Sequence, residues 1–148
     1  MFTEQVETYI HAARASVWTM FTDVHKWHQW HPKIEEGTIA DDMAWAEGTT
    51  IMVRSTVLGF IPVSLLGRIQ MTVPQMSAVI EWHGIGIEFI DAFQFTDDLG
   101  GCRVRLRRTV HGPIAFLLRP LPSVLQGHLR QWTQSLREAV EKPRGSGR

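Results

Sequence analysis

The residues best suited to chemistry are polar side chains on faces that are otherwise apolar: Asp91, Arg108 and His128. Asp91 lies between Phe89 and Phe93 in an alternating stretch, and Arg108 occupies an apolar position of the next such stretch. A carboxylate beside a guanidinium can anchor a polar ligand group, and an imidazole can donate a hydrogen bond or transfer a proton. These residue types therefore indicate an interior site, provided that the elements carrying them face one another.

The two alternating stretches are predicted to form an antiparallel hairpin. Residues 102–111 alternate between an apolar face and a polar face that carries three arginines, and a fourth arginine, Arg108, falls on the apolar face. If the turn is a four-residue loop from Asp98 to Gly101, Asp91 stands directly opposite Arg108. Cross-strand neighbours on one face are about 5 Å apart, so the two charges can pair.

Stability alone does not explain such a pair. At 4 Å the attraction is worth about 4 kcal/mol at an effective dielectric near 20, while desolvation costs several kcal/mol per charge. The first interpretation is a pair near a cavity mouth or sheet rim that touches no ligand. The second is a polar anchor for a ligand's carboxylate, phenol or carbonyl, and a catalytic role is the least favoured.

His128 belongs to a predicted amphipathic helix over residues 121–140, whose apolar residues recur at helical spacing. There it projects into the apolar stripe beside Leu125 and Trp132. The favoured interpretation is a neutral core histidine that is hydrogen-bonded to a backbone carbonyl or a buried water. The alternative is a histidine that donates to a ligand, or acts on it as acid or base.

The elements that position these residues follow a simple order: one strand, two short helices, six strands and a long helix. We predict strands at 3–10, 33–40, 48–57, 65–73, 78–82, 87–95 and 102–111, and helices at 13–22, 24–30 and 121–140. Consecutive strands with short turns give a curved antiparallel sheet, so the fold class is α+β. Met71 and Val73 are expected to share a face with Ile69.

The apolar segment Leu58–Val63 is unusual between two strands. It is interpreted as a lid at the cavity entrance. The two alternatives are a contact between two copies of the chain through Phe60 and a segment tucked under the helix. Ser55, just before it, shares a face with Val53 and Val57. It is either a cavity hydroxyl or a small polar group tolerated in the core.

Several short motifs carry a resemblance to a known family: Val17-Trp18, Asp23-Val24 with Trp27, Trp30-His31-Pro32, Gly101-Cys102-Arg103-Val104 and Gly112-Pro113. With the order of elements, they make residues 3–141 similar to the START-like (SRPBCC) superfamily, in its polyketide cyclase/dehydrase-like branch. The resemblance implies a helix-grip, in which a curved seven-stranded sheet wraps around the terminal helix with a hydrophobic cavity between them. It provides no shared catalytic motif to transfer.

The expected function is binding of a small hydrophobic molecule, such as a lipid, a polyketide or an aromatic, quinone-like compound. The candidate ligand-binding residues are Asp91, Arg108, His128, Ser55, Phe89, Phe93, Trp132 and Leu125. One alternative is an aromatic polyketide cyclase or dehydratase, with Arg108 as the cation and Asp91 or His128 as the base. Another is a protein-interaction helper in lipid or respiratory metabolism.

The amino-acid composition excludes some classes of partner and supports others. Fifteen basic and fifteen acidic residues cancel in 148, so no overall field favours nucleic acid. A single cysteine, Cys102, suits a reducing cytoplasm, and no apolar run is long enough to span a membrane. We expect one domain over residues 1–141 and a disordered tail over 142–148.

No cofactor motif is present, and we expect no cofactor. His25, His28 and His31 recur at three-residue spacing, but only Asp23 could add a further metal ligand. We therefore expect no metal site, and interpret the three as surface histidines beside buried tryptophans.

Overall fold

The computed structural model of the chain describes residues 2–40, 44–57, 61–112 and 122–142. Its elements, in chain order, are β1 (Phe2–Ile10), α1 (Arg14–Thr22), the 3-10 turn η1 (Val24–Lys26), α2 (Trp27–Trp30), β2 (Ile34–Ile39), β3 (Thr50–Val57), β4 (Ile61–Val73), β5 (Ser77–Gly84), β6 (Ile87–Asp98), β7 (Gly101–His111) and α4 (Pro122–Glu141). This α+β order confirms the predicted fold class.

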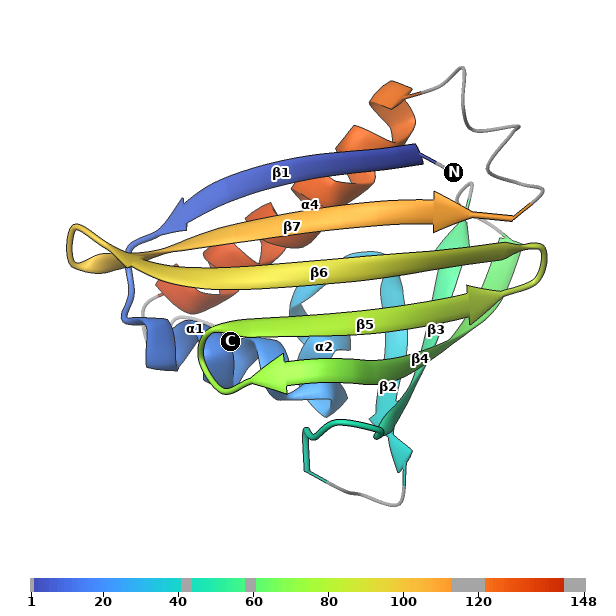
Figure 1. The fold of residues 1–148 in the computed structure, drawn as a ribbon, viewed down its shortest axis with the longest axis horizontal. Helices are drawn as coiled ribbons and strands as arrows, with labels where there is room; N and C mark the ends of the chain where they lie inside the picture. The colour runs from blue at the N-terminus through green and yellow to red at the C-terminus, as the bar shows by residue number, and fades with distance from the viewer. Residues whose placement is uncertain (1, 41–43, 58–60, 113–121, 143–148) are drawn as a thin grey trace.

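The described strands form one antiparallel seven-stranded sheet in the order β1-β7-β6-β5-β4-β3-β2. The sheet curls, so that β2 and β3 turn away from the plane of β6 and β7 (Figure 1). Helix α4 lies on the concave side, against β1, β7, α1 and α2. This arrangement is the helix-grip that the family resemblance implied.

In Figure 1 the short helices lie along the lower part of the sheet, α1 at the left and α2 nearer the centre. Gly37 of β2 makes this packing possible, because a Cβ atom there would lie 2.7 Å from the carbonyl oxygen of Val24 in η1. The chain from η1 into α2 is thus held directly against β2. That contact fixes where Trp27, Trp30 and His31 lie.

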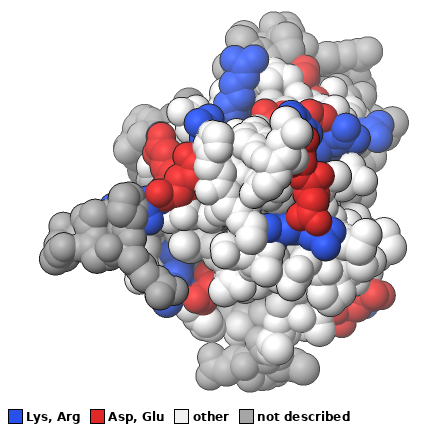
Figure 2. All heavy atoms as spheres, turned by 90° about the vertical axis from the view of Figure 1, so that its left-hand side faces the viewer, with Lys and Arg blue, Asp and Glu red and all other residues white. Residues whose placement is uncertain are grey.

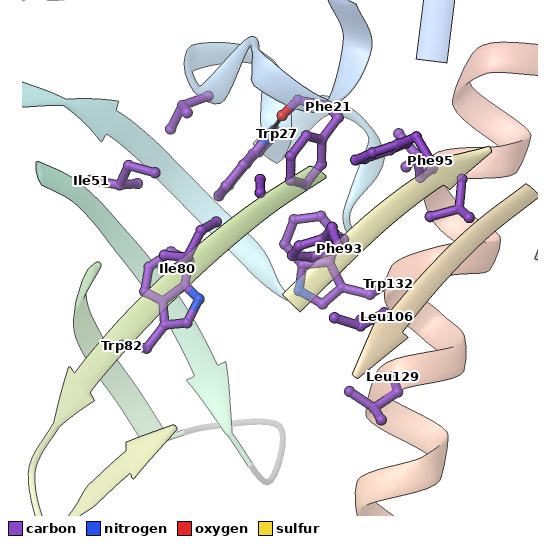
Figure 3. Close-up of a cluster of buried hydrophobic side chains, with 14 of the residues drawn as sticks. Phe21, Trp27, Ile51, Ile80, Trp82, Phe93, Phe95, Leu106, Leu129 and Trp132 are labelled. Atoms are coloured by element: carbon purple, nitrogen blue, oxygen red, sulfur yellow. Dashed lines mark hydrogen bonds between the residues drawn. The ribbon is translucent and has the colours of Figure 1, made fainter. Parts of the chain in front are cut away.

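Aromatic rings fill the concave side next to the short helices. The ring centroid of Phe21 in α1 lies 4.5 Å from that of Phe93, 5.1 Å from that of Trp45 and 5.2 Å from that of Phe95. The ring centroids of Trp18 and Phe95 are 5.3 Å apart. Figure 3 shows Phe21, Phe93 and Phe95 converging from α1 and β6. We call these five residues the aromatic end of the concave face.

The hairpin between β6 and β7 has the predicted register: Asp91 pairs with Arg108, and Phe93 with Leu106. Its turn is tighter than expected, because Asp98 and Gly101 are themselves paired and two residues connect them. Leu99 and Gly100 both have positive φ, at 49° and 82°, as a type I′ turn requires.

Strand β4 departs from the sequence prediction at both ends. A register shift between Ile69 and Met71 reverses the alternation, which leaves Met71 52% exposed and Val73 exposed as well. The expectation that both residues share the face of Ile69 was therefore wrong. At the other end β4 starts at Ile61, so only residues 58–60 of the predicted lid, Phe60 among them, lie outside the described residues.

Helix α4 buries Leu129, Trp132 and Leu136, as its apolar spacing predicted. Within the part of the chain that the structure describes, no helix is both long and apolar enough to cross a membrane. Figure 2 views the end where the β6–β7 hairpin projects, and there basic and acidic side chains lie beside one another. Ion pairs such as Arg103–Asp98 at 2.6 Å account for this mixing.

Candidate functional site

The centre of the concave face holds a buried ion pair between Asp91 of β6 and Arg108 of β7. The guanidinium Nε and Nη2 donate to the two carboxylate oxygens at 2.7 and 2.8 Å. Asp91 is 1% exposed and Arg108 is 9% exposed. The bidentate geometry confirms the predicted pairing and uses both oxygens of Asp91.

The ion pair continues as a polar row across the sheet toward β1. Glu4 stands opposite Arg108 on the same face, and its Oε2 accepts a hydrogen bond of 2.7 Å from Gln126 of α4. The Gln126 amide also donates to the Gln5 carbonyl. The row therefore connects the sheet to the amino-terminal half of α4.

Aromatic rings enclose the ion pair on the side of β5. The Arg108 guanidinium carbon lies 4.4 Å from the centroid of the Phe89 ring, within cation–π distance. Phe89 in turn stacks on Trp82 at 6.3 Å. Trp82 lies flat against Gly67, where an added Cβ would come within 2.7 Å of the indole.

His31, between α2 and β2, is part of the same environment, and the expectation that it is a surface histidine was wrong. It is 5% exposed, and its ring lies 4.9 Å from Trp132 of α4. The physical reason is that Val24, Trp27 and His31 recur at helical spacing on one buried face. That spacing is the signal by which the sequence could have revealed it.

The protonation state of His31 follows from its surroundings. Burial, followed by the positive charge of Arg108, lowers its pKa from 6.5 to about 4. The Lys33 backbone N–H donates to Nδ1 at 3.1 Å, so the neutral ring carries its proton on Nε2. Near neutral pH, His31 is thus an uncharged donor through Nε2.

His128 is exposed, which contradicts the favoured prediction of a core histidine. The residue lies in the first half of α4, where its ring is only partly covered. Partial burial is the main cause that lowers the pKa of His128, and the positive charges of Arg108 and Lys33 lower it further. His128 therefore lies at the border of the polar region and is neutral near pH 7.

The remaining predicted residues divide between structural and interior positions. The Ser55 hydroxyl donates to the Lys33 carbonyl, which ties β3 to the start of β2. Phe93 packs into the aromatic end, whereas Trp132 lies between that end and His31. The Leu125 side chain lies outside the described residues.

Hydrogen bonding among the buried polar side chains is incomplete. Four buried side-chain nitrogens have no hydrogen-bond partner among the described residues, and three of them belong to Trp30, His31 and Trp82. Trp30 packs against both His31 and Trp132. In Figure 3 the indole nitrogen of Trp82 points away from β5 toward the side where α4 lies. A buried donor without an acceptor is costly, so each of these groups requires an explanation.

Exposure rises along the concave face away from the aromatic end. On β4, Ile69 is fully buried, Leu65 and Val63 are half-buried, and Ile61 is 38% exposed. Ile87, at the start of β6, is half-buried too. We call this region the open end; it lies on the right-hand side of Figure 1.

Two surface hollows formed by described residues lie elsewhere. One, of about 350 Å³, is bounded by Thr19, Asp23, Ile39 and Trp45, outside the short helices. The other, of about 220 Å³, lies beside Arg14 at the outer edge of β4 and β6. Neither contains the residues of the ion pair.

The fold and this interior identify the class of protein as a START-like helix-grip. The chain belongs to the family described as polyketide cyclase / dehydrase and lipid transport, whose model matches residues 1–141. A comparison with curated proteins finds no match.

Solved structures share the fold at low sequence identity. TTHA0849 from Thermus thermophilus has a TM-score of 0.78 and 20% identity, over 94% of this chain and 97% of that one. A START superfamily protein from Mycobacterium smegmatis has a TM-score of 0.74 and 13% identity, over 95% and 97%. The di-domain ARO/CYC protein BexL, from the BE-7585A biosynthetic pathway, has a TM-score of 0.73 and 14% identity, over 97% of this chain and 48% of that one.

Proposed function

We propose that the protein binds one small, largely apolar molecule between the concave face of the sheet and α4. The observation that supports this most is the set of buried polar groups on that face whose hydrogen bonds the described residues leave incomplete. A stable core avoids such groups, because each costs free energy unless a partner is bound. A molecule with an apolar body and a polar end would complete them.

The position of these groups supports the same proposal. Trp82 stands opposite Phe89, on the side of the aromatic end where inward-facing side chains become increasingly exposed, and His31 packs against Trp132 of α4. A ligand entering from the open end would place its apolar part against Phe89, Trp82 and Trp132. Its polar part would then meet Arg108 and His31.

Catalysis is a weaker candidate on the same geometry. Both Asp91 oxygens already accept hydrogen bonds from Arg108, so the carboxylate is held in a bidentate pair and is not presented to a substrate. His128 is the group that favours a catalytic role, because it is neutral near pH 7 and can act as a base. Binding requires no such step, and is therefore the function we put forward.

Native mass spectrometry of the freshly purified full chain tests the proposal. We expect a non-covalent adduct of a few hundred daltons, absent after denaturation. Protein stripped of this adduct should gain thermal stability in the presence of aromatic ketones, fatty acids or sterols, because a ligand that binds only the native state raises its stability. Absence of an adduct together with no stabilisation by any of these compounds would rule the function out.

A further inference from the structure

One of the four buried nitrogens that have no hydrogen-bond partner within the described part of the chain lies outside the interior. It is Nε of Arg14, the first residue of α1. An Asp97 carboxylate oxygen stands 3.6 Å away, which is close enough for an ion pair but too far for a hydrogen bond. A charged donor that is shielded from water and has no acceptor is costly, so Arg14 requires a further partner.

Arg14 lines the smaller surface hollow, of about 220 Å³, together with Val73, Met76 and Phe95. The Met76 N–H donates to the Val73 carbonyl at 2.9 Å, and the Phe95 N–H donates to the Met76 carbonyl at 2.8 Å. These bonds hold the turn between β4 and β5 against β6. Figure 1 shows this turn and α1 at the same, left-hand end of the sheet. The hollow is therefore framed by hydrogen-bonded backbone.

Two apolar side chains of the hollow are open to water. The register shift in β4 turns Val73 outward and leaves it 43% exposed, and Met76 is 51% exposed. Phe95, between them and the core, is buried. Exposed apolar surface beside a charged donor that lacks an acceptor favours a molecule that carries both an apolar part and an acceptor.

The other polar side chains around the hollow add donors. The Gln94 side-chain oxygen accepts from Arg105 at 3.3 Å, so this amide has its N–H groups left to offer. Ser77 pairs with Gln94 across β5 and β6, and its hydroxyl can donate as well. The hollow thus presents a cation and several donors to one small volume.

Charge favours an anionic acceptor. A carboxylate can accept from Nε and from a second nitrogen of the Arg14 guanidinium at once. Asp97 competes only weakly for this position, because its side chain is 70% exposed and water screens its charge. The first turn of α1 carries no acidic residue that would repel an anion.

Volume and lining limit the ligand to a small molecule with two parts. Pockets for drug-sized ligands measure about 300–1,000 Å³, and this hollow is smaller. An inorganic anion would satisfy Arg14 but leave Val73 and Met76 in water. A hydrocarbon would cover these two side chains but leave Nε of Arg14 without an acceptor.

We propose that this hollow is a second binding site, separate from the interior, for a small carboxylate with an apolar body, such as a short-chain or aromatic acid. The carboxylate accepts from Arg14, and the apolar body lies against Val73 and Met76. Gln94 and Ser77 are further donors at the rim. Arg14, Val73 and Met76 take no part in the interior site, so this inference stands independently of the proposed function.

Three small probes test the inference: benzoate, benzamide and acetate. Benzamide has the shape of benzoate without its charge, and acetate has the charge without the ring. Titration of the isotope-labelled full chain, followed by NMR, gives the affinities and the residues affected. We expect benzoate to bind with a dissociation constant of about 1 mM, at least about tenfold more tightly than either other probe. The signals of Arg14, Met76 and Gln94 should shift most.

Three variants assign the binding to Arg14. Arg14→Met keeps an apolar stem and removes the donors, so benzoate should bind as weakly as benzamide. Asp97→Asn removes the competing carboxylate and should tighten benzoate binding several-fold. Arg54→Met is the matched control, because Arg54 makes ion pairs of the same length, 3.6 Å, with Glu35 and Glu36 on β2, and it should leave benzoate binding unchanged. If Arg14→Met does not fold, Asp97→Asn still provides the test.

Four results would each overturn the inference. They are equal affinities for benzoate and benzamide, no benzoate binding in the millimolar range, unchanged benzoate binding in Arg14→Met or Asp97→Asn, and NMR shifts confined to the interior residues Trp82, Phe89 and Trp132. None of these results removes the proposed function, which depends on the adduct seen by native mass spectrometry. Absence of that adduct would in turn leave the second site standing.

Discussion

Rings fill one end of the concave face, whereas polar groups with incomplete hydrogen bonds line the region toward the other end. Next to the aromatic end, the Trp27 indole has a partner, since it donates to the Phe21 carbonyl at 2.7 Å. Toward the other end, the corresponding nitrogens of Trp30 and Trp82 have none among the described residues. The comparison suggests that one end supplies stability and the other is arranged for binding, so that the two properties should be separable by mutation.

The largest effect should come from the aromatic end. Phe21→Ala removes a fully buried ring with four aromatic neighbours within 6 Å, so we expect a loss of about 4 kcal/mol in the free energy of unfolding. Urea denaturation measures it. Leu99→Ala, at the exposed hairpin tip, is the control and should change stability by less than about 0.5 kcal/mol. Similar values for the two variants would contradict the role given to the aromatic end.

Breaking the buried ion pair should lower the free energy of unfolding by nearly as much as Phe21→Ala does. Asp91→Leu leaves Arg108 charged and unpaired in the interior, with an expected loss of at least about 3 kcal/mol. The double variant Asp91→Leu/Arg108→Leu should recover most of that loss, because no charge is then buried. Asp98→Ala, which breaks the peripheral pair with Arg103, should cost less than about 1 kcal/mol. A double variant less stable than Asp91→Leu would show that the pair itself stabilises the fold.

Acid should lower the stability of the protein through the buried His31. The pKa of His31 is about 4 in the folded protein against an ordinary value of 6.5. As the pH falls, the unfolded chain therefore binds a proton at His31 at a higher pH than the folded protein does. The contribution of neutral His31 is fully present above pH 6.5 and is lost as the pH falls toward 4, by up to about 3 kcal/mol. Denaturation at pH 7 and pH 4.5 should show a smaller loss in His31→Gln than in the wild type. His28→Gln, at an exposed position, serves as the control, and equal losses in all three proteins would refute the assignment.

Two glycine substitutions should change the free energy of unfolding in opposite directions. Gly67→Ala pushes a Cβ into the Trp82 indole, which is confined between Trp27 and Phe89, so we expect a loss of about 2 kcal/mol and altered tryptophan fluorescence. Gly127→Ala, in α4, has open space around the new Cβ and should gain about 0.5–1 kcal/mol through higher helix propensity. A neutral Gly67→Ala would mean that the Trp82 ring is free to move.

The smallest effect is expected on the convex face. Glu7→Gln removes contacts with Arg105 at 2.8 Å and Arg103 at 3.7 Å, both partly exposed. Such pairs are worth less than about 1 kcal/mol, and the difference should shrink further in high salt. An effect as large as that of Asp91→Leu would remove the distinction between interior and surface charges.

The parts of the fold that the sequence predicted well are those with strict periodicity. Alternation through residues 102–111, with a short turn, was enough to place Asp91 opposite Arg108, because antiparallel pairing leaves few registers compatible with one buried face. The apolar spacing of α4 likewise identified Leu129, Trp132 and Leu136 as buried.

Other positions depended on features that periodicity does not encode. The register shift in β4 turned Met71 outward, and no local residue pattern marks it. His31 was misassigned because three histidines at equal spacing suggested a common surface, although Gly37 allows η1 and α2 to pack closely on β2. The incomplete hydrogen bonds of Trp30 and Trp82 arise only where distant segments meet, so no local sequence pattern reveals them.

The two-residue turn at Leu99 and Gly100 has a consequence for how this protein can vary. Its side chains are exposed, so exchanges of residue type that keep the left-handed backbone should be harmless there. An insertion or deletion of a single residue is different, because a slip by one position would carry every side chain of β7 to the opposite face and expel Arg108 from the interior. The length of this loop, rather than its composition, is thus the constrained quantity, and peptide tags or fusion partners should be placed elsewhere.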